Sequence, residues 1–306
     1  MYRKWLNQIF CQNNRQKKIN IINLCLRMVK CMPELPEVET VKETLKKQIL
    51  KRKIEKVKIL YDGIIATDKN EFAKKIVGQT FRDIKRRGKF LIFELDDYYL
   101  VSHLRMEGKY FLKPIEDEIS KHEHIIFYFS DISLRYHDTR KFGKMYLVTK
   151  DKLYTDTPLI HIGLEPWDDK LNSDYLKEKY NLNTAIKTLL LNQDILTGIG
   201  NIYADEILFM SKINPMKKGK DLTKIDCDNI ITNTREVLAE AIKMGGTTIR
   251  SYTSSLGVTG HFQGNLLVHN QDGKKCKECG SIIIKTKVNG RGTYYCPTCQ
   301  KGEECI

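Results

Sequence analysis

The sequence has no apolar run long enough to cross a membrane. A membrane-spanning helix needs about 18 or more consecutive apolar residues, and no run in the 306 residues approaches that length. A signal-peptide pattern, an internal repeat and a low-complexity tract are also absent. These absences argue against a membrane-spanning protein, a disulfide-stapled secreted protein and a repeat architecture. The apolar fraction of 41% is ordinary for a globular protein, and the length suits two or three domains.

An N-terminal segment lacks acidic side chains altogether. Residues 1–31 contain no Asp or Glu but seven basic residues: Arg3, Lys4, Arg15, Lys17, Lys18, Arg27 and Lys30. Removing these seven from the 52 basic residues leaves 45 basic against 38 acidic residues in the remainder, a net charge of +7 compared with +14 for the whole chain. A positive net charge favours a polyanionic partner. A generally solvated basic surface is the alternative interpretation.

Cysteine is sparse until the C-terminus. Three of the nine cysteines lie in residues 1–31, Cys227 is isolated, and the other five lie beyond residue 275. Because no signal-peptide pattern precedes them, we expect reduced thiols in a cytoplasmic setting and no disulfide framework.

Four C-terminal cysteines form two Cys-x-x-Cys pairs separated by sixteen residues. They are Cys276, Cys279, Cys296 and Cys299. This spacing predicts one tetrahedral Zn²⁺ with four thiolate ligands. Four thiolates leave no coordination position for water, which indicates a structural ion that folds a module too small for its own core. A redox dithiol or free structural cysteines are the alternatives.

The rest of the chain divides into a strand-rich part and a helix-rich part. Seven short strand-like segments across residues 53–148 predict an antiparallel sandwich or barrel, and a helix is predicted before them at residues 36–50. One face of that helix is apolar: Val38, Val41, Leu45 and Ile49. After a turn-rich linker at residues 163–170, helical periodicity runs through residues 173–250. A short strand-like region with the cysteine pairs follows from residue 262.

Two glycine-containing turns are candidate phosphate sites. In "LTGIGNIYADE", Gly198 and Gly200 form a turn and Asn201 is predicted to cap the next helix, so open backbone amides there can hold a phosphate. In "NGRGTYY", Arg291 is predicted at an exposed hairpin tip between the cysteine pairs. A simple helix connection and a solvated turn arginine are the respective alternatives.

Several motifs together carry a resemblance to a known family. They are "MPELPEVET", "RRGKFL", "SHLRMEG", "YHDTRKFG", "LTGIGNIYADEIL" and the four-cysteine finger with "GRGTYYC". From Met32 to about Lys301 the chain resembles the formamidopyrimidine-DNA glycosylases, bacterial enzymes that repair 8-oxoguanine. The resemblance implies an α+β multidomain fold, with an N-terminal antiparallel β-sandwich and flanking helix, a helix–two-turn–helix domain and a zinc-finger hairpin. The expected division is a leader at 1–31 and domains at 32–165, 166–262 and 263–306.

The resemblance implies that Pro33 is the nucleophile, exposed once Met32 is removed. A terminal secondary amine has a usable lone pair near neutral pH, whereas an amide nitrogen inside a chain has none. We therefore expect residues 1–31 to be absent from the active enzyme. A misassigned start codon, with translation beginning at Met32, is favoured over a cleaved presequence, because the leader is poor in serine and has no clear amphipathic face.

The other catalytic roles are also implied by the resemblance. Glu34 corresponds to the general acid/base, and Glu37 to a glutamate that supports the site. Lys89 corresponds to the lysine of proton transfer and phosphate contact during β-elimination, and Arg291 to the finger arginine of backbone binding and δ-elimination. One structural Zn²⁺ is implied, with no part in the chemistry.

The implied DNA contacts include residues that replace an extruded base. Met106, Arg140 and Phe142 correspond to the trio that fills the gap left by a flipped nucleotide, and they favour this family over the related pyrimidine-specific endonuclease VIII. His122 corresponds to a DNA contact, and Asn201 corresponds to the phosphate-binding asparagine of the helix–two-turn–helix element.

The chain departs from the family's pattern at two positions that bear on DNA binding, and one loop segment matches that pattern. Asn183 stands where many relatives have a DNA-contacting lysine, for which nearby Lys187 could compensate. Thr139 replaces a frequent proline before the wedge arginine, which weakens the expectation of a rigid loop. The segment Ser251–Gln263 corresponds to a mobile loop that closes on the flipped base.

The implied partner is double-stranded DNA containing oxidised purines or abasic sites, bound by a monomer in the bacterial cytoplasm. The implied reaction is base excision followed by β,δ-elimination at the abasic site. One alternative is a catalytically silent lesion-binding protein, which would hold if residues 1–31 stay attached. Endonuclease VIII-like specificity is a second. A zinc-ribbon DNA-binding factor is a third, but it does not account for Pro33, Glu34 and Lys89.

Overall fold

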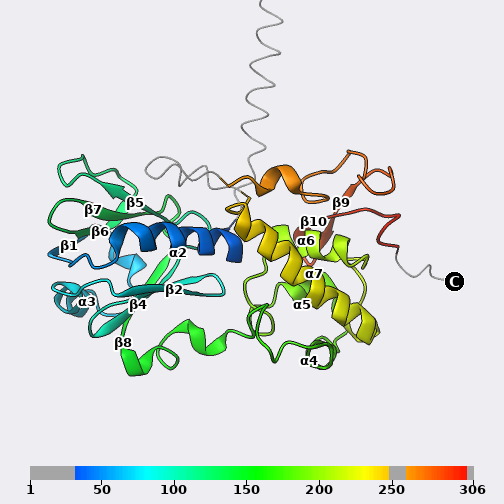
Figure 1. The fold of residues 1–306 in the computed structure, drawn as a ribbon, viewed down its shortest axis with the longest axis horizontal. Helices are drawn as coiled ribbons and strands as arrows, with labels where there is room; N and C mark the ends of the chain where they lie inside the picture. The colour runs from blue at the N-terminus through cyan, green and yellow to red at the C-terminus, as the bar shows by residue number, and fades with distance from the viewer. Residues whose placement is uncertain (1–31, 248–259, 302–306) are drawn as a thin grey trace, which may run out of the picture. The chain divides into compact units, whose positions relative to one another are not determined.

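Two four-stranded antiparallel sheets form the N-terminal half of the described chain (Figure 1). The computed structural model describes residues 32–247 and 260–301. One sheet has the order β1-β6-β7-β5 and the other β2-β3-β4-β8. The strands are β1 (Lys56–Ile59), β2 (Asp83–Arg87), β3 (Phe90–Glu94), β4 (Tyr98–His103), β5 (Lys109–Lys113), β6 (Glu123–Tyr128), β7 (Ser133–His137) and β8 (Lys144–Thr149). The predicted β-sandwich is therefore confirmed.

The sandwich core is made by alternate residues of the strands. Phe93 of β3, Phe127 of β6 and Tyr136 of β7 are fully buried members of one apolar cluster, as expected for the inner faces of two packed sheets. All seven predicted strands are present, but β2 was not predicted. Its sequence, DIKRR, has Ile84 as its only buried residue, so it carries little apolar signal. The short helix α3 (Lys69–Ile76), with two buried residues, was also not predicted.

Helix α2 (Leu35–Ile49) connects the sandwich with the helical part of the chain. The predicted apolar face is confirmed, since Val38, Val41, Leu45 and Ile49 are almost completely buried. Pro36 occupies the first turn, where its missing N–H costs no hydrogen bond. The helix packs on β2 and also contacts α7 (Lys224–Lys243). Its N-terminal end therefore lies where the two parts of the chain meet.

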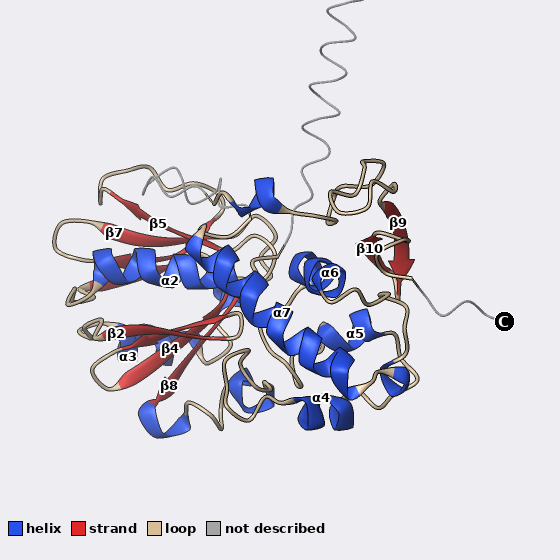
Figure 2. Ribbon diagram, turned by 45° about the vertical axis from the view of Figure 1, so that its right-hand side comes forward, coloured by secondary structure: helices blue, strands red, loops and turns tan. Residues whose placement is uncertain are grey.

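The helical part contains α4 (Ser173–Lys179), α5 (Ile186–Leu190), α6 (Asn201–Met210) and α7. Gly245 and Gly246, both with positive φ, directly follow the C-terminus of α7, as the sequence predicted. The predicted N-cap of α6 was wrong by one residue. Gly200 occupies the cap position and Asn201 is the first helical residue. In Figure 2 the sheets lie at one end of the described chain and these helices at the other.

The C-terminal part is a hairpin of β9 (Ile284–Val288) and β10 (Arg291–Tyr295). Its two-residue turn is Asn289-Gly290, both with positive φ, which is the usual composition of this tight turn. Arg291 is the first residue after the turn. The hairpin shares a small apolar cluster with Phe209 of α6, so it packs against the helical part of the chain. Within residues 32–247 and 260–301, no helix has the length and hydropathy needed to span a bilayer.

Candidate functional site

The carboxylate of Glu34 lies in the turn that starts α6. Its oxygens accept hydrogen bonds from the backbone N–H groups of Gly200 at 2.7 Å, Ile202 at 2.9 Å and Tyr203 at 3.4 Å. A Cβ atom at position 200 would lie 2.3 Å from the Glu34 carboxyl carbon, so only glycine allows this approach. The amides that the sequence suggested for a phosphate are therefore occupied by a carboxylate of the chain itself, which corrects that prediction.

Burial sets the protonation of Glu34. The side chain is 1% exposed, and this burial raises the pKa of the carboxyl to about 7, although neighbouring Lys89 and the amides of Ile202 and Gly200 lower it. A carboxyl group that titrates near neutral pH can both donate and accept a proton. Pro33 directly precedes it and is half-buried.

Glu37 holds the start of α2 and the end of α7 together. Its Oε2 accepts the backbone N–H of Glu34 at 2.9 Å, and its Oε1 accepts from the Tyr203 hydroxyl at 2.7 Å and the Thr247 N–H at 2.8 Å. Gly246 is required here, because its φ is positive and an added Cβ would lie 2.6 Å from Glu37 Oε1. Glu37 therefore fixes the backbone on which Pro33 and Glu34 lie.

Lys89 reaches the same place from a β-hairpin. It follows Gly88, whose positive φ forms the turn between β2 and β3. The Lys89 side chain is 4% exposed, and its Nζ donates to the carbonyl of Ile199 at 2.9 Å. A cation is thus placed at the turn that also binds Glu34, which agrees with the effect of Lys89 on the Glu34 pKa.

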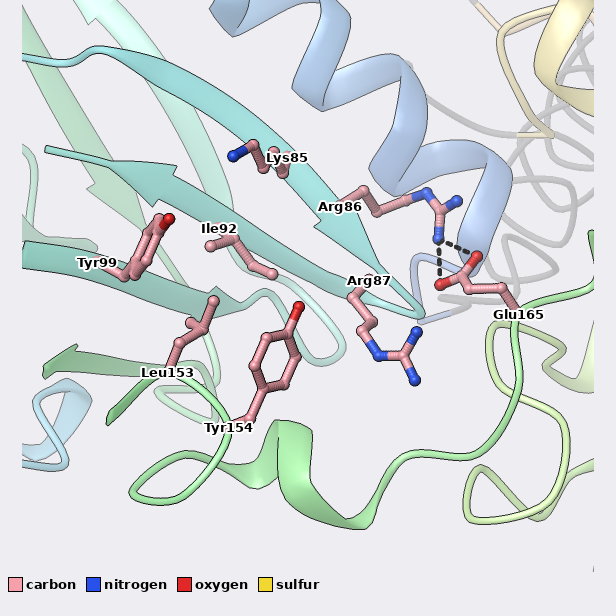
Figure 3. Close-up of a pocket in the computed structure, with 8 residues that line it drawn as sticks. All are labelled: Lys85, Arg86, Arg87, Ile92, Tyr99, Leu153, Tyr154 and Glu165. Atoms are coloured by element: carbon pink, nitrogen blue, oxygen red, sulfur yellow. Dashed lines mark hydrogen bonds and ion pairs between the residues drawn. The ribbon is translucent and has the colours of Figure 1, made fainter. Parts of the chain in front are cut away.

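The linker supports the hairpin that carries Lys89. Glu165 accepts from the Gly88 N–H at 2.5 Å and from Arg86, and Arg86 also pairs with Glu39 of α2 at 2.7 Å. Figure 3 shows the Arg86 guanidinium directed toward Glu165, beside a cavity of about 310 Å³. The turn-rich linker is therefore a structural element of the site.

Sequence reasoning missed His103 as a neighbour of Lys89. Its ring packs edge-on against Phe90 at 4.5 Å between centroids, and its Nδ1 accepts the N–H of Arg105 at 3.0 Å. Burial, with a smaller effect of Arg105 and Lys89, lowers the pKa of His103 to about 3, so the ring is neutral. The only sequence signal was its place within "SHLRMEG", because its register opposite Phe90 appears only in the sheet.

A second group of predicted residues lies on the loop between β7 and β8. The buried Asp138 carboxylate accepts the N–H of Arg140 at 2.9 Å, of Phe142 at 2.9 Å and of Gly143 at 2.8 Å. The Arg140 guanidinium lies 4.6 Å from the centre of the Phe142 ring. Arg140 is exposed and Phe142 is 50% exposed, so a fixed backbone presents a cation and an aromatic ring to solvent.

The loop that carries Met106 is joined to this one. Thr139 Oγ1 donates to Glu107 Oε2 at 3.1 Å, which links the residue after Met106 to the residue before Arg140. Gly108 and Gly143 both approach the Tyr136 hydroxyl so closely that a Cβ at either position would collide with it. The rigidity put in doubt by the absence of proline is therefore supplied by a hydrogen bond and by close packing.

Asn201 and Arg291 are brought together through one carbonyl group. The carbonyl of Gly292, the residue after Arg291, accepts from Asn201 Nδ2 at 3.1 Å and from Lys187 Nζ at 2.8 Å. Lys187 is 1% exposed and is also paired with Asp205 at 2.7 Å. This burial and pairing argue against the suggestion that Lys187 compensates for the DNA-contacting lysine replaced by Asn183, because its ammonium group is used to position the hairpin.

The remaining predicted residues that the structure describes, His122 and Asn183, contact other parts of the chain than the Glu34 turn. His122 is half-buried and packs against His137, with 5.4 Å between ring centroids. Asn183 is exposed and lines a cavity beside the β9–β10 hairpin. The segment 251–259 of the predicted mobile loop lies outside the described residues.

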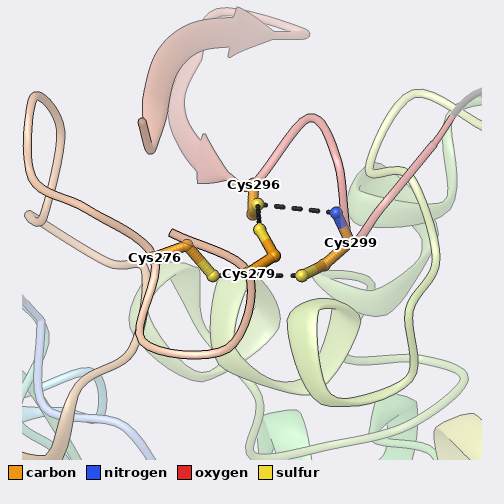
Figure 4. A group of neighbouring side chains, drawn as sticks. All are labelled: Cys276, Cys279, Cys296 and Cys299. Carbon is orange, nitrogen blue, oxygen red and sulfur yellow. Dashed lines mark hydrogen bonds between the residues drawn. The ribbon is translucent and has the colours of Figure 1, made fainter. Parts of the chain in front are cut away.

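The four predicted zinc ligands converge. Figure 4 shows the side chains of Cys276, Cys279, Cys296 and Cys299 turned toward one another. Their Sγ atoms all lie within 4.8 Å of each other, with 3.9 Å between Cys276 and Cys299 and 3.3 Å between Cys279 and Cys296. Thiolates about 2.3 Å from a tetrahedral zinc are about 3.8 Å apart, so the residues fit one structural Zn²⁺.

We expect one zinc per chain and loss of the finger's fold when a ligand is removed. Cys279→Ser should bind less metal and lose hydrogen-exchange protection in β9 and β10, while the sandwich stays protected. Cys305→Ser, which changes a cysteine outside the two pairs, is the control and should resemble the unchanged protein. Full protection of the hairpin after zinc has been removed by a chelator would contradict the assignment.

Three family models match successive parts of the chain. Residues 32–145 match the formamidopyrimidine-DNA glycosylase N-terminal domain, and residues 162–253 match the formamidopyrimidine-DNA glycosylase H2TH domain. Residues 273–302 match the zinc finger found in FPG and IleRS.

Individual relatives match over their whole length. Formamidopyrimidine-DNA glycosylase of Oceanobacillus iheyensis is 47% identical over 279 residues, which cover 90% of this chain and 100% of the relative. That of Bacillus licheniformis is 46% identical over 274 residues, with 88% and 100% covered. Two Lactococcus lactis structures, an FPG mutant with Fapy-dG-containing DNA and Fpg with abasic-site DNA, each align with a TM-score of 0.84 at 42% identity, covering 88% of this chain and 100% of theirs.

Proposed function

The chain belongs to the formamidopyrimidine-DNA glycosylase family, and on that premise we propose how its residues act on damaged DNA. It is a DNA glycosylase with AP lyase activity that binds DNA containing formamidopyrimidine or abasic sites. We extend this to 8-oxoguanine in duplex DNA, bound by a monomer in a bacterial cytoplasm. The observation that carries the mechanism is the buried carboxyl of Glu34, which directly follows Pro33, is held by the amides at the start of α6 and has Lys89 as a charged neighbour.

Pro33 is the proposed nucleophile. Its free amine forms a bond to the sugar C1′ as the bond from C1′ to the damaged base breaks, and the base leaves with a proton from Glu34. The amine then gives its proton to the Glu34 carboxylate. Glu34 protonates the ring oxygen as the bond from that oxygen to C1′ breaks, which leaves a cationic iminium. The iminium is an electron sink for the next steps. The pKa of about 7 at Glu34 supports both proton donation and proton acceptance.

Lys89 and Arg291 are the proposed partners of strand cleavage. β-Elimination removes a proton from C2′ and breaks the bond to the 3′ phosphate, and δ-elimination then breaks the bond to the 5′ phosphate. Lys89 is near enough to Glu34 to lower its pKa, which supports a role in proton transfer. Arg291 is exposed at the hairpin turn and held in place through Gly292, which supports a phosphate contact. Zinc supplies only the fold of this hairpin.

The proposed DNA contacts fall into two groups of residues. Met106, Arg140 and Phe142 fill the space of the extruded nucleotide, and the fixed loops that carry them support this role. His122, Asn183 and Asn201 contact the DNA backbone. We retain the division into 32–165, 166–262 and 263–306, with residues 1–31 outside the active enzyme. The first family match begins at residue 32, in support of this boundary.

Lesion specificity is tested with matched duplexes. A chain that begins at Pro33 should excise formamidopyrimidine and 8-oxoguanine and leave phosphates on both ends of the gap, as β,δ-elimination requires. A duplex with an oxidised pyrimidine at the same position should be cut much more slowly. A preference for the pyrimidine would favour the endonuclease VIII-like alternative, and tight lesion binding with no cleavage would favour the catalytically silent one.

A further inference from the structure

A cavity of about 440 Å³ lies between the start of the helical part and the zinc hairpin. Its lining includes Asn183, Met216, Lys218 and Lys287, and no acidic side chain among the described residues contributes to it. Lys218 and Lys287 are exposed. Two cations and one amide thus face a common hollow without a compensating carboxylate.

The backbone around both lysines is fixed. The segment before α5 pairs with the residues around Lys218, through Ile186 N–H to Lys217 carbonyl at 2.8 Å and Gly219 N–H to Thr184 carbonyl at 2.9 Å. Lys287 lies in β9, where it is paired in register with Gly292. The two lysines therefore come from separate parts of the fold, and their fixed backbones place both at the lining of one cavity.

Neither lysine has an ion-pair partner within residues 32–247 and 260–301. Their neighbours differ in this respect. Lys217, next to Lys218, is paired with Asp226 at 2.9 Å, and Lys212 is paired with Glu278. The positive charge at the cavity is therefore uncompensated within the described chain, which makes the hollow attractive to an anion.

We propose that Lys218 and Lys287, with the amide of Asn183, hold a phosphate of the bound DNA backbone. Lys287 is opposite Gly292, whose carbonyl fixes the Arg291 turn, so this site continues the backbone contact proposed for Arg291. Exposed lysines bind a single phosphate ion weakly, but they add to the affinity for a polyanion by releasing its counterions. The site takes a phosphodiester of DNA, and this assignment rests on the proposed function.

The test compares the salt dependence of DNA binding. A Lys218→Gln/Lys287→Gln variant and the unchanged protein are titrated with an abasic-site duplex between 50 and 200 mM salt. Loss of one phosphate contact should lower the slope of log K against log salt by about 0.9. Lys58→Gln/Lys74→Gln, which removes two exposed lysines of the sandwich part, is the matched control and should keep the slope. Equal slopes for the cavity variant and the control would overturn the proposal.

Two further measurements separate the other outcomes. Inorganic phosphate alone should show no saturable binding that depends on the two lysines, and saturable binding would assign the cavity to a small anion instead of DNA. Excision of formamidopyrimidine by the unchanged protein is measured under single-turnover conditions with saturating protein. If the unchanged protein binds DNA but excises nothing, the proposed function fails. The change in the salt-dependence slope still tests whether the two lysines contact a DNA phosphate.

Discussion

A chain that begins at Pro33 should be captured covalently on lesion-containing DNA by borohydride, and the 306-residue chain with residues 1–31 attached should not. Only the first has a terminal secondary amine, and reduction converts its iminium to a stable link. An amide nitrogen has no available lone pair, so retention of the leader should reduce trapping to background. The measurement is the yield of protein–DNA adduct on a denaturing gel.

Two controls separate chemistry from binding in this experiment. Pro33→Gly keeps a terminal amine, although a primary one, and should still be trapped. Acetylation of the terminus leaves the site otherwise intact and should abolish trapping. Normal excision and trapping by the chain that retains its leader would refute the proline mechanism, and Lys89 would then be the next candidate nucleophile.

Glu34→Gln should reduce base excision by roughly 10²- to 10⁴-fold, the usual contribution of general acid–base catalysis. The pH profile should change as well. Glu34 acts as an acid only while protonated, below its pKa of about 7, whereas the α-amine is neutral only above about 8. The unchanged protein should therefore show a bell-shaped kcat/KM with a maximum near pH ~7.5. Because Glu34 and the α-amine are neighbours, the apparent pKa of each limb of the profile describes the coupled pair of groups and not one group alone.

The variant should lose the alkaline limb of that bell and keep the acidic one. An unaltered bell would mean that Glu34 is not the acid. Glutamine offers one acceptor oxygen where Glu34 offers two to the three amides, so the variant should also lose about 1–3 kcal/mol of stability. Thermal unfolding and DNA binding, measured in parallel, distinguish this loss from the catalytic one.

Glu34 should also make stability depend on pH. Its folded pKa of about 7 lies above the ordinary value of 4.5, so between these pH values the folded chain holds a proton that the unfolded chain has released. Stability should therefore fall as pH rises from about 4.5 to about 7. Glu34→Gln should lack this contribution.

Local patterns in the sequence were enough for much of the fold. The apolar face of α2, seven sandwich strands and the zinc hairpin all depend on spacing within one segment, which a single sequence displays. Strand β2 was missed because its one buried residue, Ile84, gives no alternation to recognise. The sequence therefore identified the motif around Lys89 but not the β2–β3 hairpin that carries it. The hydrogen bond from the Gly88 N–H to Glu165 was not predicted either.

Contacts between distant segments limited the prediction of the site. The helix-start amides look open in sequence, and only the fold shows that Glu34, more than 160 residues earlier, occupies them. The same is true of Lys187, which its sequence position suggested as a DNA contact but which is buried and pairs with Asp205 and the Gly292 carbonyl. Residue type and spacing indicate chemistry, but they do not state which groups compete for the same partner.

The three amides held by Asp138 have a consequence for kinetics. Fixing the backbone of one residue costs about 1–2 kcal/mol of conformational entropy. The backbone of the loop that carries Arg140 and Phe142 is already fixed by these bonds in the folded chain, before any DNA is bound. The DNA contact proposed for Arg140 and Phe142 then leaves only these two exposed side chains to be ordered. A protein that must test very many undamaged base pairs can therefore probe each one without a folding step in the loop.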